Sequence, residues 1–260
     1  MAAGGSQTTY VDGNIDGATG CRTACKECNN CPARANLIKK GKNPNQVVVN
    51  DLELRTILDP KKVKPHGLYL LCGNSDPFIE EMEVVWERLV KMLRARQDAL
   101  FLALTKRLPA AARFEARFGV VPNLWLGTSA GRQESFNQRI PELFAIPAAG
   151  YVISLQPLRE QINLVSALHQ PGLKLVVSGC EIGLDVWRCP KDWTDSIKSQ
   201  CRKFKVDCFI TRWVDEQGHV HVSPTRNGRG SKDKSRPSFN PHRRASWWPT
   251  IGERYFKKAS

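Results

Sequence analysis

Short apolar runs recur along the chain, and most of them are separated by a segment with helical character. They are TYVDGN (9–14), LYLLCG (68–73), ALFLAL (99–104), LWLGTS (124–129), YVISL (151–155), LKLVVSG (173–179) and CFITRWV (208–214). Apolar runs of this length are typical of strands that are buried on both faces. Repeated strand-helix units form right-handed crossovers, so the sequence predicts an α/β fold with a parallel sheet, open or curled toward a barrel.

Two intervening segments have amphipathic helical patterns. Residues 76–97 carry one apolar face, and Asp76 and Pro77 suit the cap and the first turn of that helix; the face consists of Met82, Val85, Trp86, Leu89 and Leu93. Residues 192–205 carry a second stripe that includes Cys201, which we therefore expect in the core. A helix after Ser129 should be interrupted at Pro141, and residues 159–168 are a weaker helical candidate.

The helical and strand periodicity ends near Val222. We therefore expect a folded unit over residues 1–222 and a basic C-terminal extension over residues 223–260. The chain carries a net charge of +14, and the extension contains ten Lys and Arg residues against two acids. This charge favours a polyanionic partner such as nucleic acid, because neutralising phosphates releases counterions, although a solvated tail that aids solubility would look the same.

The sequence shows no secretory signal and no apolar stretch near the roughly 20 residues that span a bilayer. We expect a soluble, cytoplasmic protein with no membrane partner. In a reducing compartment cysteines hold metals or do redox chemistry more often than they form disulfides, and the count of nine cysteines is odd.

Four of the nine cysteines lie close together in GCRTACKECNNCPARA (20–35). A zinc site is one interpretation, although Cys21, Cys25, Cys28 and Cys31 are too close in sequence for two separate knuckles and would need a cysteine from elsewhere. A 4Fe-4S cluster held by three thiolates, with one iron open to a small molecule, is another. Free thiols without a ligand are the third interpretation, and it is disfavoured because exposed thiolates this dense would oxidise or scavenge metal.

The core resembles the phage-encoded three-cysteine-motif family, which is thought to be related to radical S-adenosylmethionine enzymes. Gly20, Cys21, Cys28, Cys31 and Ala33 keep the cysteine pattern of that family, and Pro32 replaces its aromatic residue. Further similar blocks follow in the same order over residues 8–214; they are LLCGNSDPF, LTKR, PNLWLGTSA, RIPELFAIPAAGYVISLQPL and LVVSGCEIG.

The resemblance implies a partial (β/α)6 barrel with a 4Fe-4S cluster, S-adenosylmethionine and an external electron donor. It implies Cys21, Cys28 and Cys31 as the cluster ligands, with Cys25 as a spare or alternative ligand. The polar residues that follow the strands would bind the cofactor at the mouth of the barrel. They are Asn74, Ser75, Asp76, Thr105, Lys106, Arg107, Ser129, Ser154, Gln156 and Glu181.

Several of these residues have simpler interpretations or depart from the family pattern. Asp76 could only cap a helix, and Lys106 with Arg107 could be a surface pair at a helix start. Gln156 stands where the family has Glu, and Cys180 where it has the second Gly. Trp125 and Trp213 are expected in the core.

The extension is outside the resemblance. Trp247 and Trp248 lie beside Arg243 and Arg244 in a polar, basic stretch, where bases could stack on the rings, or where the rings could pin the extension to the barrel.

Together, these features favour a radical enzyme that acts on a nucleobase. We expect a step in the hypermodification of phage DNA, such as the isomerisation of an amino-acid-decorated thymidine, in the cytoplasm of an infected host. A radical DNA-repair or RNA-modifying enzyme is an alternative. A non-catalytic nucleic-acid-binding protein stabilised by zinc or a cluster is the alternative from a different class.

Overall fold

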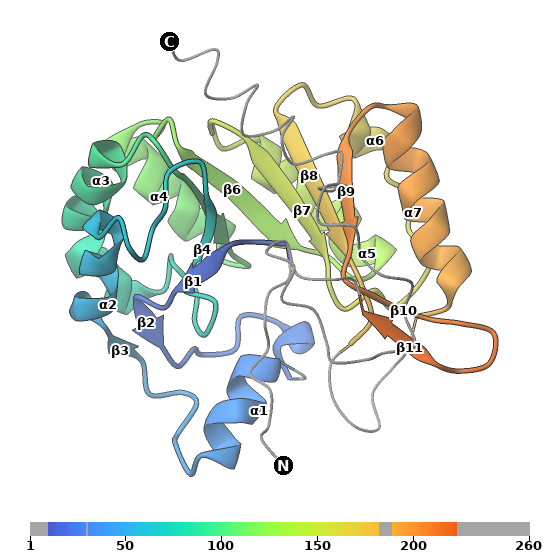
Figure 1. Ribbon diagram of the computed structural model, residues 1–260, viewed down its shortest axis with the longest axis horizontal. Helices are drawn as coiled ribbons and strands as arrows, with labels where there is room; N and C mark the ends of the chain where they lie inside the picture. The colour runs from blue at the N-terminus through green and yellow to red at the C-terminus, as the bar shows by residue number, and fades with distance from the viewer. Residues whose placement is uncertain (1–9, 30, 182–188, 223–260) are drawn as a thin grey trace.

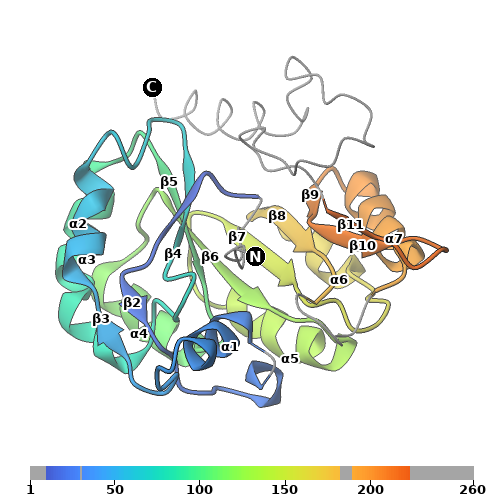
Figure 2. The same ribbon diagram turned by 60° about the horizontal axis from the view of Figure 1, so that its bottom comes forward.

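The computed structural model describes residues 10–29, 31–181 and 189–222. Seven parallel strands form one sheet in which each strand pairs with the next along the chain, in the order β1-β4-β5-β6-β7-β8-β9. The sheet curls into a half-barrel, as Figures 1 and 2 show. Its strands are β1 (Gly13–Ile15), β4 (Leu68–Leu71), β5 (Leu100–Leu104), β6 (Leu124–Ser129), β7 (Tyr151–Leu155), β8 (Leu173–Ser178) and β9 (Asp207–Ile210).

Helices cover the outer face of this sheet, and α1 lies below it in the view of Figure 1. The helices are α1 (Pro32–Lys39), α2 (Asp51–Arg55), α3 (Trp86–Ala95), α4 (Leu108–Phe118), α5 (Gln133–Phe144), α6 (Val165–Leu168) and α7 (Lys191–Lys203). Short 3-10 helices are η1 (Lys26–Cys28), η2 (Thr56–Leu58) and η3 (Glu80–Val85). Two small antiparallel pairs complete the fold: β2 (Ala18–Thr19) with β3 (Val48–Val49), and β10 (Arg212–Val214) with β11 (Val220–Val222).

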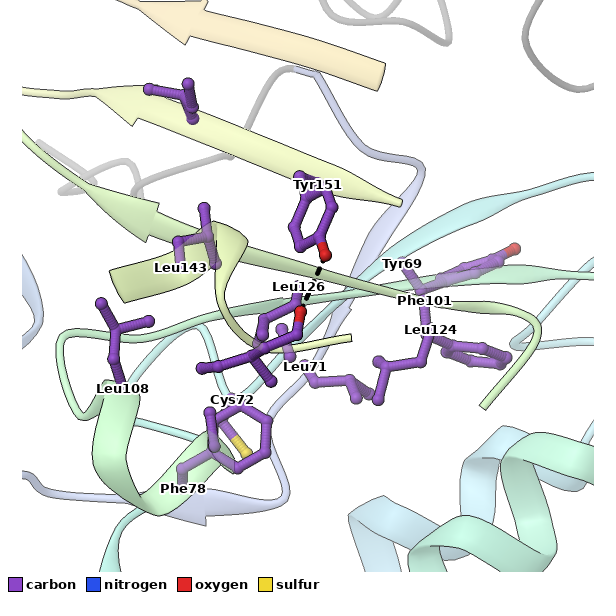
Figure 3. Close-up of a cluster of buried hydrophobic side chains, with 14 of the residues drawn as sticks. Tyr69, Leu71, Cys72, Phe78, Phe101, Leu108, Leu124, Leu126, Leu143 and Tyr151 are labelled. Carbon is purple, nitrogen blue, oxygen red and sulfur yellow. Dashed lines mark hydrogen bonds between the residues drawn. The ribbon is translucent and has the colours of Figure 1, made fainter. Parts of the chain in front are cut away.

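The strands are apolar on both faces because each face of the sheet has its own core. Alternate residues of β4 divide between the two: Leu68 and Leu70 belong to a cluster with Trp125, whereas Tyr69 and Leu71 belong to the cluster that includes the helices. Figure 3 shows part of this outer cluster, where the Tyr151 hydroxyl donates to the carbonyl oxygen of Ile146 at 2.8 Å. The seven predicted runs therefore all contribute strands, and the half-barrel alternative is confirmed.

The helix predicted over residues 76–97 starts later than its pattern suggested. Residues 80–85 form η3, and the α-helix begins at Trp86, whose indole N–H donates to the carbonyl of Pro77. Asp76 caps neither helix, because Ile79 precedes η3 and Val85 precedes α3. The predicted apolar face is nevertheless fully buried.

Two further expectations differ from the structure. Helix α5 runs through Pro141 to Phe144, since Ile140 and Leu143 on either side of the proline are buried and hold the last turn in place. The run 208–214 splits in two: β9 stays in the sheet, whereas β10 leaves it to pair with β11. Trp213 is consequently only half-buried and stacks on His221. Trp125 and Cys201 are fully buried, as predicted.

Candidate active site at the carboxyl edge of the sheet

Asp76 connects the ends of β4 and β5. Its carboxylate is 7% exposed and accepts from the Thr105 hydroxyl at 2.8 Å and from the backbone N–H of Phe78 at 2.9 Å. The Arg107 guanidinium lies 3.9 Å away. Burial raises the pKa of Asp76, and the donors around it only partly offset this effect. The simple helix-cap interpretation of Asp76 is therefore replaced by a role that ties two strand ends together.

Asn74 and Ser75 hold the segment that leads into the cysteines. The Asn74 amide donates to the Asp16 carboxylate at 2.7 Å, and the Ser75 hydroxyl donates to the carbonyl of Gly20. Gly20 has a φ of +86°, and a Cβ at this position would lie 2.0 Å from the carbonyl oxygen of Gln46. Only glycine fits there, so the backbone direction immediately before Cys21 is fixed.

The cysteine loop, residues 21–31, meets two basic side chains at the end of β5. Lys106 Nζ lies 4.0 Å from Cys28 Sγ, and Arg107 Nη2 lies 3.9 Å from Cys21 Sγ. Arg107 also donates to the carbonyl of Arg22 at 2.6 Å. The surface-pair interpretation of Lys106 and Arg107 does not describe these contacts, because both side chains turn toward the thiols.

The environments of the thiols differ. Burial raises the pKa of Cys21, although Arg107 works against this. Burial also opposes ionisation of Cys28, but the Lys106 charge and backbone donors outweigh it, so that the pKa of Cys28 lies below its ordinary value. Cys28 thus ionises more readily than Cys21.

Cys25 and Cys31 flank Cys28 in the sequence and differ in how they contact it. The sulfur atoms of Cys25 and Cys28 are 3.8 Å apart. Cys31 precedes the first residue of α1, its backbone N–H donates to the carbonyl of Cys28 at 3.2 Å, and its carbonyl accepts from Ala35. All four thiols are partly exposed. The loop therefore offers Cys21 and Cys28 beside the basic pair, with Cys25 and Cys31 as candidates for a third ligand.

An ion pair that the sequence did not indicate fastens the loop to α5. The Arg139 side chain, 11% exposed, donates to the Glu27 carboxylate and to the carbonyl oxygen of Ser129 at 2.6 Å. Burial opposes ionisation of Glu27, but the Arg139 and Ser135 donors outweigh it and lower the pKa of this carboxyl. Glu27 lies inside the cysteine loop, so the pair links that loop to the end of β6.

The predicted residues after β7 and β8 form a separate group at the same edge of the sheet. Gln156 donates to the Thr211 hydroxyl at 2.6 Å, and Glu181 forms an ion pair with Arg159. Ser154 is buried, and its carbonyl accepts from Ala130.

Asp16, Glu27, Arg139, Arg159 and Thr211 were missed by the sequence analysis. Asp16 could have been found, since it follows the first strand directly, as the predicted residues follow theirs. Arg139 could not, because it lies inside a helix and its partner is 112 residues away in the chain.

The donor set of the cysteine loop consists of four partly exposed thiols. Within residues 10–29, 31–181 and 189–222, no group of three or more His, Cys, Asp or Glu side chains is placed to hold one metal ion. Three or four partly exposed thiols on one loop, beside two cations that offset thiolate charge, match the chemistry by which proteins hold iron-sulfur clusters. The residues present thus fit the implied group.

Two other expectations concern the basic extension and the absence of a membrane span. Arg243, Arg244, Trp247 and Trp248 lie outside the described ranges, as does the whole predicted extension. Among the described residues, no helix has the length and apolar character needed to cross a bilayer.

A family model described as "Protein of unknown function (DUF5131)" matches residues 5–238. No curated protein matches the sequence.

Solved structures of spore photoproduct lyase have a similar fold. A double mutant with bound AdoMet and dinucleoside spore photoproduct aligns with a TM-score of 0.54 and 12% sequence identity, over 80% of this chain and 81% of that chain. A single-residue mutant gives 0.53 and 13% over 80% of each chain. The complex with dinucleoside spore photoproduct gives 0.52 and 12% over 79% of each chain. At such identities the likeness establishes the fold alone, a curled half-barrel of parallel strands covered by helices.

Proposed function

The chain belongs to the DUF5131 family of proteins of unknown function, and we propose that it is a radical S-adenosylmethionine enzyme that acts on a nucleobase. The observation that carries this proposal is the contact between the cysteine loop and the end of β5, where Lys106 and Arg107 reach Cys28 and Cys21. Parallel α/β sheets place their chemistry at the carboxyl ends of their strands. A loop of thiols held at that edge is where an iron-sulfur cofactor would meet a substrate.

Cys21, Cys28 and Cys31 are the proposed cluster ligands, with Cys25 as the alternative. A bound 4Fe-4S cluster with one open iron would supply the electron, received from an external donor, that cleaves S-adenosylmethionine and so allows hydrogen to be removed from an unactivated carbon. The pKa of Cys28, which Lys106 and backbone donors hold below its ordinary value, favours the thiolate form that ligation needs.

The strand-end residues would orient S-adenosylmethionine. Lys106 and Arg107 are the proposed partners of its carboxylate, and Asp76 positions Arg107 and the backbone of Lys106. The remaining proposed contacts come from the neighbouring strand ends, at Asn74, Ser75, Thr105, Ser129, Ser154, Gln156 and Glu181. The Glu181–Arg159 pair lies at the same edge of the sheet, after β8 and β7. It gives that part of the mouth one group of each charge, which suits a polar substrate.

The substrate proposal rests on the fold and on charge. One structural neighbour binds AdoMet together with dinucleoside spore photoproduct, and this chain carries a net charge of +14, which suits a polyanion. Within this class we propose a modified base in phage DNA, with isomerisation of an amino-acid-decorated thymidine as the reaction. A base in a duplex would have to be extruded into the mouth at a cost of a few kcal/mol.

The test begins with anaerobic protein reconstituted with iron and sulfide. We expect visible charge-transfer absorption and, with S-adenosylmethionine and a reductant, release of 5′-deoxyadenosine. Mass spectrometry of nucleosides from phage DNA incubated with and without the enzyme would then identify the altered base. Protein that binds iron but releases no 5′-deoxyadenosine would contradict the enzymatic proposal, and unchanged nucleosides despite that release would contradict the substrate.

A non-catalytic zinc-stabilised nucleic-acid-binding protein is the second candidate. Two thiolates at about 2.3 Å from one tetrahedral zinc ion lie roughly 3.8 Å apart, and Cys25 and Cys28 have that separation. Among the described residues, no group of three or more His, Cys, Asp or Glu side chains completes a single-ion site around this pair. Metal analysis of anaerobically purified protein separates the two, because the second candidate predicts zinc in place of iron.

A further inference from the structure

Two cysteines outside the cysteine loop are in direct contact. The sulfur atoms of Cys180, which follows β8, and Cys189, which precedes α7, are 2.7 Å apart. This is closer than the roughly 3.5–4.0 Å that separates non-bonded carbon atoms and longer than a disulfide bond of about 2.05 Å. The two sulfur atoms are therefore in direct contact, with no atom between them and only a small further approach needed for a disulfide bond.

The backbone holds both cysteines against the same strand. The N–H of Cys180 donates to the carbonyl of Arg212, and the N–H of Val214 donates to the carbonyl of Cys189, each at 3.3 Å. At Gly179 a Cβ would lie 2.1 Å from the Thr211 hydroxyl, so the end of β8 can approach the segment before β10 this closely only because residue 179 has no side chain. The sulfur contact thus rests on fixed backbone positions.

The two thiols are chemically unequal. The hydrogen bond from Cys189 lowers the pKa of Cys180 to about 7, and the same bond, together with burial, raises the pKa of Cys189. Cys180 is consequently ionised in part near neutral pH, and thiolates are the nucleophiles of disulfide exchange. A nucleophilic thiol with a second thiol beside it is the arrangement that such exchange requires.

We propose that Cys180 and Cys189 form a redox-active dithiol site that reacts with a low-molecular-weight disulfide. The Cys180 thiolate attacks one sulfur of the small disulfide, breaks its S–S bond and displaces a thiolate, which gives a mixed disulfide. Cys189 then loses its proton and attacks the Cys180 sulfur, which forms the Cys180–Cys189 bond and releases the second thiolate. Two protein thiols are oxidised, and one small disulfide is reduced to two thiols.

The site lies beside the candidate active site but does not depend on its chemistry. Glu181, next to Cys180, pairs with Arg159, so the new bond would fix the strand end that carries this pair to the start of α7. Cys180 and Cys189 are only 4% and 0% exposed. Thiol–disulfide exchange at this site therefore requires local opening of the fold. The redox equilibrium of the pair is for this reason a better measurement than the rate of its oxidation.

The test is a redox titration of the full chain, kept anaerobic, in buffers with increasing ratios of oxidised to reduced dithiothreitol. Remaining thiols are alkylated, and the protein is digested with trypsin, which cuts after Lys174, Arg188 and Lys191 and so leaves the two cysteines on different peptides. We expect peptides 175–188 and 189–191 to be joined in a fraction that rises with the ratio, and to separate on reduction.

Cys180→Ser and Cys189→Ser should each abolish the joined peptide, whereas Cys208→Ser should leave it unchanged. Full alkylation of both cysteines at every ratio, or a bond from either one to a different cysteine, would overturn the proposal. The crosslink is read in protein with or without iron, so its absence is distinguishable from failure of the proposed enzymatic function.

Discussion

Lys106 and Arg107, which follow β5, contact the cysteine loop directly. Each places a cation about 4 Å from a sulfur atom, Lys106 at Cys28 and Arg107 at Cys21. The sequence predicted that these two side chains face the cofactor, but it left a surface pair open, because a Lys-Arg pair after a strand is also typical of a solvent-exposed helix start. The contact depends on the loop at residues 21–31 reaching back over β5, a long-range feature that no local pattern carries.

The third cluster ligand can be identified by single substitutions. We expect Cys31→Ala to abolish cluster assembly and Cys25→Ala to retain it, because the resemblance that assigns the ligands leaves Cys25 as the spare. Iron and sulfide per chain after anaerobic reconstitution, with visible absorption, are the measurements. Cys21→Ala and Cys28→Ala serve as controls that should both lose iron. The reverse result, iron lost with Cys25→Ala and kept with Cys31→Ala, would assign the ligand to the thiol that lies 3.8 Å from Cys28.

Asp76 should make the stability of the fold depend on pH. Burial raises the pKa of the Asp76 carboxyl. The folded chain therefore binds a proton at this carboxyl more tightly than the unfolded chain does. Its contribution to stability is therefore complete below the unfolded pKa of about 3.9, and it is lost as the pH rises through the higher folded value. Asp76→Asn should remove this component. It should also lower the free energy of unfolding by about 1–3 kcal/mol at every pH, because the groups that donate hydrogen bonds to Asp76 would have a weaker acceptor in Asn.

The measurement is the free energy of unfolding of both proteins by urea between pH 3.5 and 7, a range set on either side of the ordinary carboxyl pKa of about 3.9. The wild type should lose stability relative to Asp76→Asn as the pH rises. A constant difference across the range would show that Asp76 titrates alike in both states.

At the scale of elements, the ion pair between the cysteine loop and α5 should determine how firmly the loop is held. Arg139 and Glu27 have side chains 11% and 25% exposed, so Arg139→Gln leaves a partly buried carboxylate with a weaker donor. We expect a loss of about 1.5–3 kcal/mol, the range for hydrogen bonds to charged groups. Faster hydrogen exchange should be confined to residues 21–29 and the end of β6.

The pair of Arg22 with Glu81 provides a matched control, because it also ties the cysteine loop to the body of the protein but is more exposed, at 44% and 33%. Arg22→Gln should destabilise the fold clearly less than Arg139→Gln, because exposed ion pairs contribute little to stability. Equal effects of the two substitutions would contradict a special role for Arg139.

The strands were predicted more accurately than the helices, and the reason is physical. A strand buried on both faces must be apolar at every position, so its sequence alone identifies it, as for residues 100–103 of β5. Helix boundaries depend on partners elsewhere: Asp76 is drawn to Thr105 and α3 starts at Trp86, while α5 continues through Pro141 because its neighbours are buried. The candidate site could be placed from the strands, because the ends of parallel strands lie at one edge of the sheet. The ion pairs that hold the site could not be predicted, because they join residues far apart in the chain.

At the scale of the whole molecule, the half-barrel leaves one edge of the sheet for chemistry, and the charge of the chain is concentrated beyond the described fold. Residues 223–260 carry ten basic residues against two acids. If this segment binds nucleic acid, a chain that ends at Val222 should bind less tightly, and its affinity should depend less on salt. The physical reason is that each phosphate neutralised releases counterions.

The measurement is DNA affinity as a function of salt for the full chain and for the chain ending at Val222. Each phosphate contact contributes about 0.9 to the slope of log affinity against log salt for B-DNA, so loss of the ten Lys and Arg residues of the extension reduces that slope by about 9 at most. Arg243→Ala with Arg244→Ala should reduce it by about 2 if both contact phosphates. Trp247→Ala with Trp248→Ala should instead lower the affinity for single strands by about 1–3 kcal/mol per stacked base and leave the slope unchanged, because stacking releases no counterions. An unchanged slope after truncation would assign nucleic-acid binding to the half-barrel itself.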